Sequence, residues 1–252
     1  MKQIKVNSLI LGDGIPKICV SDTGRDKKEI LEQAEKIKNS SAQVLEWRVD
    51  CLESAYTEEE ILEILGELRL VTGDMPLLFT FRSREEGGKR ELDDKDYLML
   101  NRWALETGMI QILDVEYSRG NEILSELRGK CREMSTVFLI SYHNFEKTPD
   151  KEFLVELSEK MKLSGADICK LAVMPENDRD VLRLLSVADI VGNQMDTPHI
   201  SISMGEKGMI SRVYAGRLGS VLTFASLDQA SAPGQIDTAE MEKILQILYE
   251  CQ

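Results

Sequence analysis

The chain has 252 residues, of which 42% are hydrophobic, enough to bury a sizeable core. Acidic residues outnumber basic ones by 44 to 31, so the net charge of −13 repels phosphate, and we expect binding neither to nucleic acid nor to an anionic membrane. No segment has the apolar length of a membrane span, and the first residues lack the pattern of a signal peptide. These features favour a cytoplasmic protein, in which an anionic substrate would need its own local cluster of cations.

Cysteine and histidine are too sparse for a zinc site or a disulfide framework. The five cysteines are scattered and form no C-x-x-C pair, which is typical of reduced thiols. The two histidines, His143 and His199, lie far apart in the sequence, which excludes a multi-histidine metal site. A cation held by carboxylates alone stays open on this basis.

The first predicted elements are two short strands, 4–11 and 17–20, on either side of the turn signal Gly12-Asp13-Gly14, and they indicate an N-terminal β-hairpin. Strands and helices alternate from there onward. Further strands are predicted at 42–49, 76–81, 109–115, 136–142, 166–175, 199–204 and 220–224. Helices are predicted at 27–39, 57–68, 94–106, 121–134, 150–163, 177–188, 208–214 and 237–248, with capping signals at Thr57 and at Thr148-Pro149.

This alternation favours an α/β fold, a (β/α)8 TIM barrel with an N-terminal β-hairpin, built as a single domain over residues 1–252. Successive strand centres are separated by roughly thirty residues, as expected for repeated βα units. An open, doubly wound sheet is the alternative, which is weakened because no G-x-G-x-x-G motif follows the first strand.

Lys170 lies in the middle of the apolar stretch 166–175, which is typical of a strand buried in a parallel sheet. Burial removes water from the ammonium group, so this position favours the neutral amine. A neutral amine is a nucleophile for carbonyl carbon atoms. The alternative is a lysine at a strand edge whose amine reaches solvent.

Polar side chains recur on alternate positions near the ends of the predicted strands, where the active site of a barrel lies. The sets that share an inward face are Glu46, Arg48 and Asp50; Thr80 and Arg82; Asp114 and Glu116; Ser141 and His143; Ile168, Lys170 and Ala172; and Ser201 and Ser203. Buried charges are costly unless they are paired, so a barrel mouth of this kind is either a paired network or a ligand site, and we favour the ligand site. His143 is the candidate general base beside Lys170, whereas His199 starts its strand and is expected to be structural.

These motifs, taken in order, carry a resemblance. The chain resembles the type I 3-dehydroquinate dehydratases of the shikimate pathway along nearly its whole length. The matching elements are Glu46-x-Arg48-x-Asp50, Phe81-Arg82-Ser83, Glu86-Gly87-Gly88, Asp114-x-Glu116, Ser141-Tyr142-His143-Asn144-Phe145, Lys170-Leu171-Ala172, Ser203-Met204-Gly205, Ser211-Arg212 and Ser231-Ala232-Pro233-Gly234-Gln235. The resemblance implies dehydration of 3-dehydroquinate to 3-dehydroshikimate in aromatic amino acid biosynthesis, by a homodimeric barrel without cofactor or metal.

The same resemblance implies roles for individual residues. Lys170 would form a Schiff base with the ketone, and His143 would act as general acid and base. Glu86 would orient His143, although the adjacent Glu85 fits equally well from the residues alone. The residues implied in substrate binding are Arg212 for the carboxylate, Glu46 and Arg82 for ring hydroxyls, Arg48 for the charge network, and Ser231 and Gln235 from a loop, 226–235, expected to close over the substrate; Ser21, Phe145 and Met204 are expected to line the pocket.

Two other functions fit parts of the pattern. A class I aldolase would share the lysine and the barrel, and it would bind a sugar phosphate at the last two βα loops. A barrel that only binds a ligand or a partner would be expected to lack one of Lys170, His143 and Glu86, all of which are present.

Overall fold

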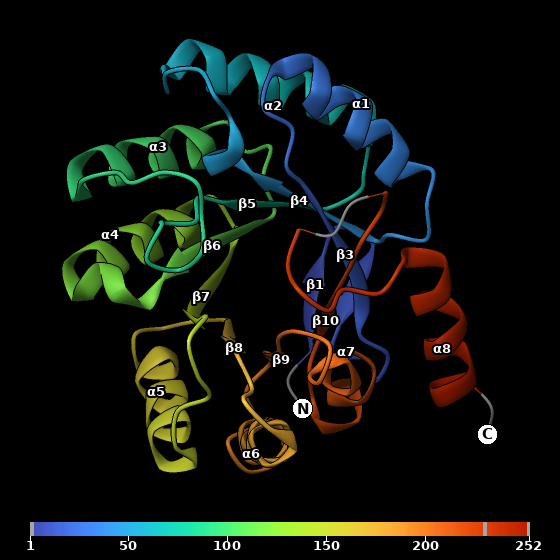
Figure 1. Cartoon of the computed structure of the whole chain (residues 1–252). Coiled ribbons are helices and arrows are strands. Elements are labelled where there is room, and N and C mark those ends of the chain that lie inside the picture. Colours follow the sequence, from blue (N-terminus) through green and yellow to red (C-terminus); the bar gives the residue numbers. More distant parts are fainter. Residues whose placement is uncertain (1–2, 229–230, 251–252) are drawn as a thin grey trace.

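The computed structural model describes residues 3–228 and 231–250, and its main feature is a ring of eight parallel strands (Figure 1). The strands are β3 Lys17–Asp22, β4 Val44–Arg48, β5 Leu77–Thr80, β6 Ile112–Glu116, β7 Val137–Asn144, β8 Ile168–Val173, β9 His199–Ser203 and β10 Leu222–Ala225. Each strand from β3 to β8 pairs with the next in chain order, β10 pairs with β3, and an isolated bridge between His199 and Ser220 links β9 to the residues just before β10. The ring closes where the Val221 amide donates to the His199 carbonyl at 2.8 Å.

Helices lie outside the ring and follow the strands around it (Figure 1). They are α1 Lys27–Lys38, α2 Glu58–Thr72, α3 Asp94–Glu106, α4 Gly120–Glu133, α5 Lys151–Leu163, α6 Asp178–Asp189, α7 Met209–Tyr214 and α8 Thr238–Glu250. Short turns, η1 Val49–Cys51, η2 Tyr117–Arg119, η3 Ile190–Gln194 and η4 Ala215–Leu218, join some of them to the strands. The predicted TIM barrel is therefore confirmed, and the alternative of an open sheet is wrong.

Two apolar cores follow from the alternation of side chains along each strand. Leu45 and Trp47 of β4 belong to the outer core, between strands and helices, together with buried helix residues such as Ile30 and Ala34. Ile168 and Ala172 of β8 belong to the inner core of the barrel. Lys170 shares the inner parity, which aims its side chain into the ring as predicted from the sequence.

Helix starts match their sequence signals in one case and differ in another. Thr57 caps α2, because its hydroxyl accepts the amide of Glu60. The predicted cap at Thr148-Pro149 is wrong, since the cap residue of α5 is Asp150. The Thr148 hydroxyl instead donates to the Met174 carbonyl at 2.9 Å, which ties the start of α5 to the end of β8.

The N-terminal hairpin is present but lies elsewhere than predicted. It consists of β1 Ile4–Val6 and β2 Leu9–Leu11, which pair antiparallel around the two-residue turn Asn7-Ser8. Asn7 has a φ of 52°, a left-handed conformation that asparagine tolerates better than most residues. The Gly12-Asp13-Gly14 signal marks only the link from the hairpin to β3, where glycine conformations are also needed.

The seventh barrel strand, β9, faces the opposite way from the prediction. Ser201 and Ser203 were expected to point into the barrel, but Ile200 and Ile202 occupy the inner core. Ser201 bonds outward to the Nδ1 atom of His199 at 2.9 Å. The small serines and the histidine therefore serve the packing between β9 and its helices, which agrees with the structural role expected for His199.

No helix in the described ranges, 3–228 and 231–250, is long and apolar enough to cross a membrane.

His199 makes the stability of the barrel sensitive to acid. Burial lowers its pKa to about 4, although the Leu218 carbonyl, 3.1 Å from its Nε2 atom, opposes the shift. In the unfolded chain the His199 imidazole takes up a proton near pH 6.5, whereas in the native protein it does so only near pH 4. As the pH falls between those values, we expect the free energy of unfolding to drop by about 3 kcal/mol. Urea unfolding at pH 7 and pH 4.5 measures it. His199→Gln should lose less over the same range, and an equal loss in both proteins would contradict this account.

Candidate active site

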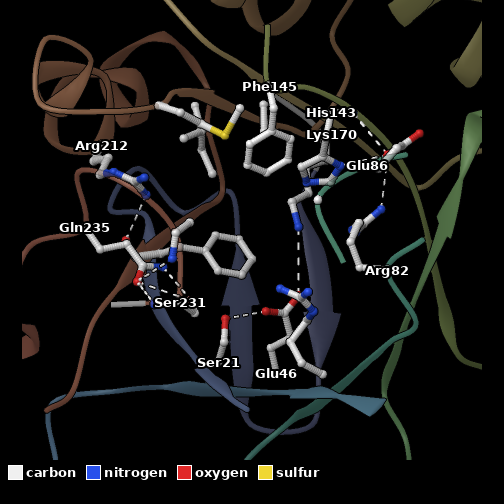
Figure 2. A pocket seen from close by; sticks show the side chains of 17 residues that line it. Ser21, Glu46, Arg82, Glu86, His143, Phe145, Lys170, Arg212, Ser231 and Gln235 are labelled. Atoms are coloured by element: carbon white, nitrogen blue, oxygen red, sulfur yellow. Dashed lines mark hydrogen bonds and ion pairs between the residues drawn. The ribbon is translucent and has the colours of Figure 1, made fainter. Parts of the chain in front are cut away.

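One pocket collects all ten residues for which the sequence predicted a role (Figure 2). They are Ser21, Glu46, Arg48, Arg82, Glu86, His143, Lys170, Arg212, Ser231 and Gln235. Most of them come from the C-terminal halves of strands or the turns that follow, which is the end of a TIM barrel where active sites form. Phe145 and Met204, expected at its wall, line it as well.

A shared carboxylate holds the lysine in place. The Nζ atom of Lys170 lies 3.2 Å from Oδ2 of Asp114, and the same oxygen accepts a 2.8 Å bond from Nη2 of Arg82. Burial acts to raise the pKa of Asp114, but the charges of Arg82 and Lys170 outweigh it and lower the pKa to about 2. Asp114 is therefore a permanent anion at neutral pH, and it balances the two buried cations.

The lysine has two further neighbours inside the barrel. A carboxylate oxygen of Glu46 lies 3.9 Å from its Nζ atom, and Figure 2 shows the lysine pointing toward that acid. The ring of Phe224 lies against the same amine, with its centroid 4.4 Å away. An apolar ring on one side and two acids on the other restrict the directions from which a ligand carbonyl can approach.

Arg82 links the lysine to the rest of the charge network. Its Nη1 atom lies 3.2 Å from Glu116, 3.3 Å from Glu86 and 2.9 Å from the hydroxyl of Ser141. Burial disfavours the charge of Arg82, but Asp114 and Glu116 outweigh burial and raise the pKa of the guanidinium. The guanidinium is thus fixed as a cation at the floor of the site.

A second arginine, Arg48, pairs with a carboxylate in the same pocket. Arg48 binds Asp50 through two parallel bonds of 2.7 and 2.8 Å, the geometry in which a guanidinium holds a carboxylate most firmly. Glu46 accepts bonds from the hydroxyls of Ser21 and Thr80, which fixes its carboxylate toward the cavity. Neutral hydroxyls, and not a bidentate arginine, restrain Glu46, so it keeps acceptor capacity for a ligand hydroxyl.

The structure resolves the choice between Glu85 and Glu86. Glu85 is exposed, whereas Glu86 is buried and its Oε2 atom lies 2.9 Å from Nδ1 of His143. The same oxygen accepts the backbone amide of His143 at 3.1 Å. An oxygen that already accepts one N–H is an acceptor for Nδ1 too, which places the ring proton on Nδ1 and leaves Nε2 as the basic nitrogen.

Burial shifts both members of this pair. It lowers the pKa of His143 well below its usual value, and the charges of Arg82, Lys170 and Arg48 act in the same direction. Burial also raises the pKa of Glu86 to about 8, an effect that Arg82 partly offsets. His143 is therefore a neutral ring at pH 7, and Phe145 stacks against it at a centroid distance of 6.5 Å.

Arg212 differs from the other arginines because its charge is unpaired. Its Nη atoms donate to the carbonyls of Phe224 and Pro233 at 3.2 and 2.9 Å, while its buried Nε atom has no partner. Burial lowers its pKa to about 10, and no carboxylate of the described residues lies against it. A buried cation that lines a pocket without an anion is suited to bind one.

Part of the loop 226–235, which was expected to close over the pocket, lies at the pocket's rim. Ser231 and Gln235 line the pocket, and the Gln235 side chain accepts the Ser231 amide at 2.7 Å. Gly234 packs tightly against Gly205, so the loops after β9 and β10 touch. Residues 229 and 230 of the predicted segment lie outside the described residues, and its closure stays a prediction.

Three contributors received no role from the sequence. Asp114 was recognised as an inward acid, but nothing along the chain identifies it as the partner of Lys170, 56 positions away. Phe224 lies on the inner face of β10, a position that only the closed ring brings to the lysine. Ser118 donates to the Oε1 atom of Glu86 at 3.1 Å from the turn after β6, and no sequence signal marks it.

A closed barrel with a buried lysine, a carboxylate-held histidine and an unpaired arginine at one mouth defines a TIM-barrel enzyme site. The family model described as type I 3-dehydroquinase matches residues 18–252. The 3-dehydroquinate dehydratase of Clostridioides difficile is 39% identical over 99% of this chain and 98% of its own length, and that of Salmonella agona is 38% identical over 99% and 100%. The chain belongs to the type I 3-dehydroquinase family.

Solved structures agree with this assignment. A type I 3-dehydroquinate dehydratase from Clostridium difficile, with covalently modified comenic acid, superposes with a TM-score of 0.96 at 38% identity, over 100% of this chain and 99% of that one. The 3-dehydroquinate dehydratase of Geobacillus kaustophilus has the same TM-score at 34% identity, over 100% and 98%.

A substitution at Gly87 tests whether the backbone conformation of the loop after β5 is needed to place Phe145 beside His143. Its φ is +86°, and an added Cβ would lie 2.3 Å from the Phe145 ring. We expect Gly87→Ala to cost about 1–3 kcal/mol and to displace Phe145 from His143, lowering turnover. Urea unfolding and steady-state rates measure both effects. The matched control is Gly129→Ala in α4, where the added methyl meets open space and should stabilise the protein by about 0.5–1 kcal/mol. Equal behaviour of the two variants would refute the prediction.

Proposed function

We propose that this protein dehydrates 3-dehydroquinate to 3-dehydroshikimate through a Schiff base on Lys170, in the shikimate pathway. The observation that carries the proposal is one pocket lined by a buried lysine amine, a neutral histidine held by Glu86, and the unpaired Arg212. Family membership supports the substrate. The related structure from Clostridium difficile carries covalently modified comenic acid, which supports covalent chemistry in this family.

The reaction needs an electron sink. A proton next to a ketone is weakly acidic, and a protonated imine withdraws electrons much better than the ketone does. Lys170 passes its ammonium proton to His143, and its Nζ atom attacks the ketone carbon to form a carbinolamine. His143 returns the proton to the carbinolamine oxygen, which leaves as water to give the iminium. Asp114, 3.2 Å from Nζ, keeps a negative charge beside that nitrogen throughout, so the cation never lacks a partner.

His143 moves the protons. Its basic Nε2 takes the proton next to the iminium carbon, and the electron pair enters the enamine. The imidazolium then gives this proton to the departing hydroxyl, which leaves as water, and hydrolysis of the imine releases the product and the lysine. Glu86 accepts a hydrogen bond from the Nδ1–H group, and this bond holds the imidazole in place and stabilises the imidazolium.

The remaining residues fit a polyhydroxylated carboxylate. Arg212 is the natural partner of the carboxylate because, among the described residues, no acid pairs with it, whereas Arg48 and Arg82 pair with Asp50 and Asp114. The groups placed to meet ring hydroxyls are Glu46, Arg82 and Arg48, with Ser21 next to Glu46 and with Ser231 and Gln235 from the loop. The homodimeric assembly and the absence of a cofactor stay predictions from the resemblance, and the cytoplasmic location stays a prediction from the composition.

A sugar-phosphate aldolase is less well supported. In many barrels phosphate binds to free backbone amides of the last two βα loops. Three amides at the end of β9 and in the loop after it already have partners: Ser203 donates to the hydroxyl of Ser211, Gly205 to the carbonyl of Pro233, and Gly208 to the carbonyl of Gly205. A phosphate would have to displace these bonds.

Trapping with borohydride tests the covalent step. We expect an intact-mass increase of one reduced ligand after incubation with 3-dehydroquinate, mapped to Lys170, because reduction makes the imine permanent. Lys170→Ala should take up no ligand covalently, whereas His143→Ala should be trapped but turn over slowly. No adduct on the folded protein would sink the mechanism, and an adduct with sugar phosphates instead would favour the aldolase.

Arg212→Ala tests the carboxylate site. Loss of a charge-assisted, bidentate contact should raise KM by about 10- to 100-fold, with a smaller effect on kcat. The control is Arg102→Ala, since Arg102 is half exposed on α3 and remote from the pocket. Rates over a range of 3-dehydroquinate concentrations give both constants, and an unchanged KM in Arg212→Ala would exclude this assignment.

A further inference from the structure

The Glu86 carboxylate is held very unevenly by its neighbours. Its Oε2 atom faces three donors, namely Nδ1 and the backbone amide of His143 and Nη1 of Arg82, at 2.9, 3.1 and 3.3 Å. Its Oε1 atom accepts one bond among the described residues, from the hydroxyl of Ser118 at 3.1 Å. The orientation of the carboxylate plane therefore depends on a single hydroxyl on one side.

The charges around Glu86 determine how much its ionised form depends on the hydrogen bond from Ser118. Asp114 and Glu116 of β6 repel the carboxylate, and burial disfavours its charge. Arg82 attracts it, but its Nη1 atom is shared with Glu116 and Ser141 at shorter distances. The balance of these groups disfavours the ionised form, so each hydrogen-bond donor to the carboxylate counts.

Ser118 is placed to act from outside the pocket. It lies in η2, directly after β6, and its residue is exposed to solvent, whereas Glu86 is buried. Ser118 is not among the residues that line the pocket, so it has no route to the substrate except through Glu86. The segment after β5, which carries Glu86, is also joined directly to the end of β6, because the Ser83 amide donates to Glu116 at 2.8 Å.

We propose that Ser118 is a positioning residue of this site: its hydroxyl aligns the Glu86 carboxylate and stabilises its anionic form, so that Oε2 fixes the proton of His143 on Nδ1. This inference rests on the proposed function, in which His143 is the general base. Loss of the hydroxyl leaves Oε1 without a protein donor, lets the carboxylate rotate, and favours its protonated form. When Glu86 is protonated on Oε2, it donates to Nδ1 in place of accepting from it, and Nε2 loses its basic tautomer.

The pH profile of turnover tests the proposal. Removing a donor to the carboxylate raises the pKa of Glu86, so the acidic limb of kcat in Ser118→Ala should move to higher pH by about half a unit to one unit. KM at the optimum should stay within about twofold, because Ser118 does not line the pocket. Ser118→Thr keeps the hydroxyl and should restore the limb. Ser125→Ala, at an exposed serine of α4, should match the unaltered protein.

A second measurement separates this inference from the proposed function. Titration of the His143 ring nitrogens by NMR, in protein without ligand, should show a changed Nδ1 signal in Ser118→Ala and an unchanged one in Ser118→Thr. An unaltered protein that fails to dehydrate 3-dehydroquinate would overturn the proposed function, while the titration would still report on the Ser118 contact. An active protein whose pH limb and ring signals are the same in Ser118→Ala would overturn the role of Ser118 alone.

Discussion

The site depends on one carboxylate, that of Asp114, which is shared by two buried cations. Oδ2 lies 2.8 Å from Arg82 and 3.2 Å from Lys170, and Oδ1 accepts a 2.5 Å bond from Ser141. An unpaired charge inside a barrel costs several kcal/mol, and Asp114 offsets part of that cost for both cations. The Lys170 amine is consequently held beside an anion before the reaction and, as the proposed iminium, during it.

The rest of the charge network grows outward from this contact. Arg82 is held by Asp114, and it passes the constraint to Glu116 and Glu86. Glu86 in turn orients His143. Arg212 stands apart from the network, without an acid of its own, and this difference is what suits it to an external anion. The charged groups around Lys170 and His143 are thus paired with one another, whereas Arg212 lines the pocket without an acid among the described residues.

Much of the fold could be predicted because repeated local patterns imply it. Alternation of short apolar strands with amphipathic helices predicted the barrel, and strand parity correctly aimed Lys170 inward and Leu171 outward. The failures came where a local signal was ambiguous. Gly12-Asp13-Gly14 is a stronger turn signal than Asn7-Ser8, although the hairpin turns at Asn7-Ser8. In β9, polar character suggested an inward face, but both faces of a barrel strand are buried, and the serines pack outward.

The sequence by itself determined the residue types of the site and the ends of the strands that carry them, because the period of side chains along a strand is a local property. It also determined the family, through motifs that recur in order along the chain. Only the tertiary structure decided which acid serves which base. Glu86 instead of Glu85, Asp114 beside Lys170, Phe224 over its amine and Ser118 on Glu86 are contacts between residues on different strands and loops, and closing the ring of eight strands is what brings them together.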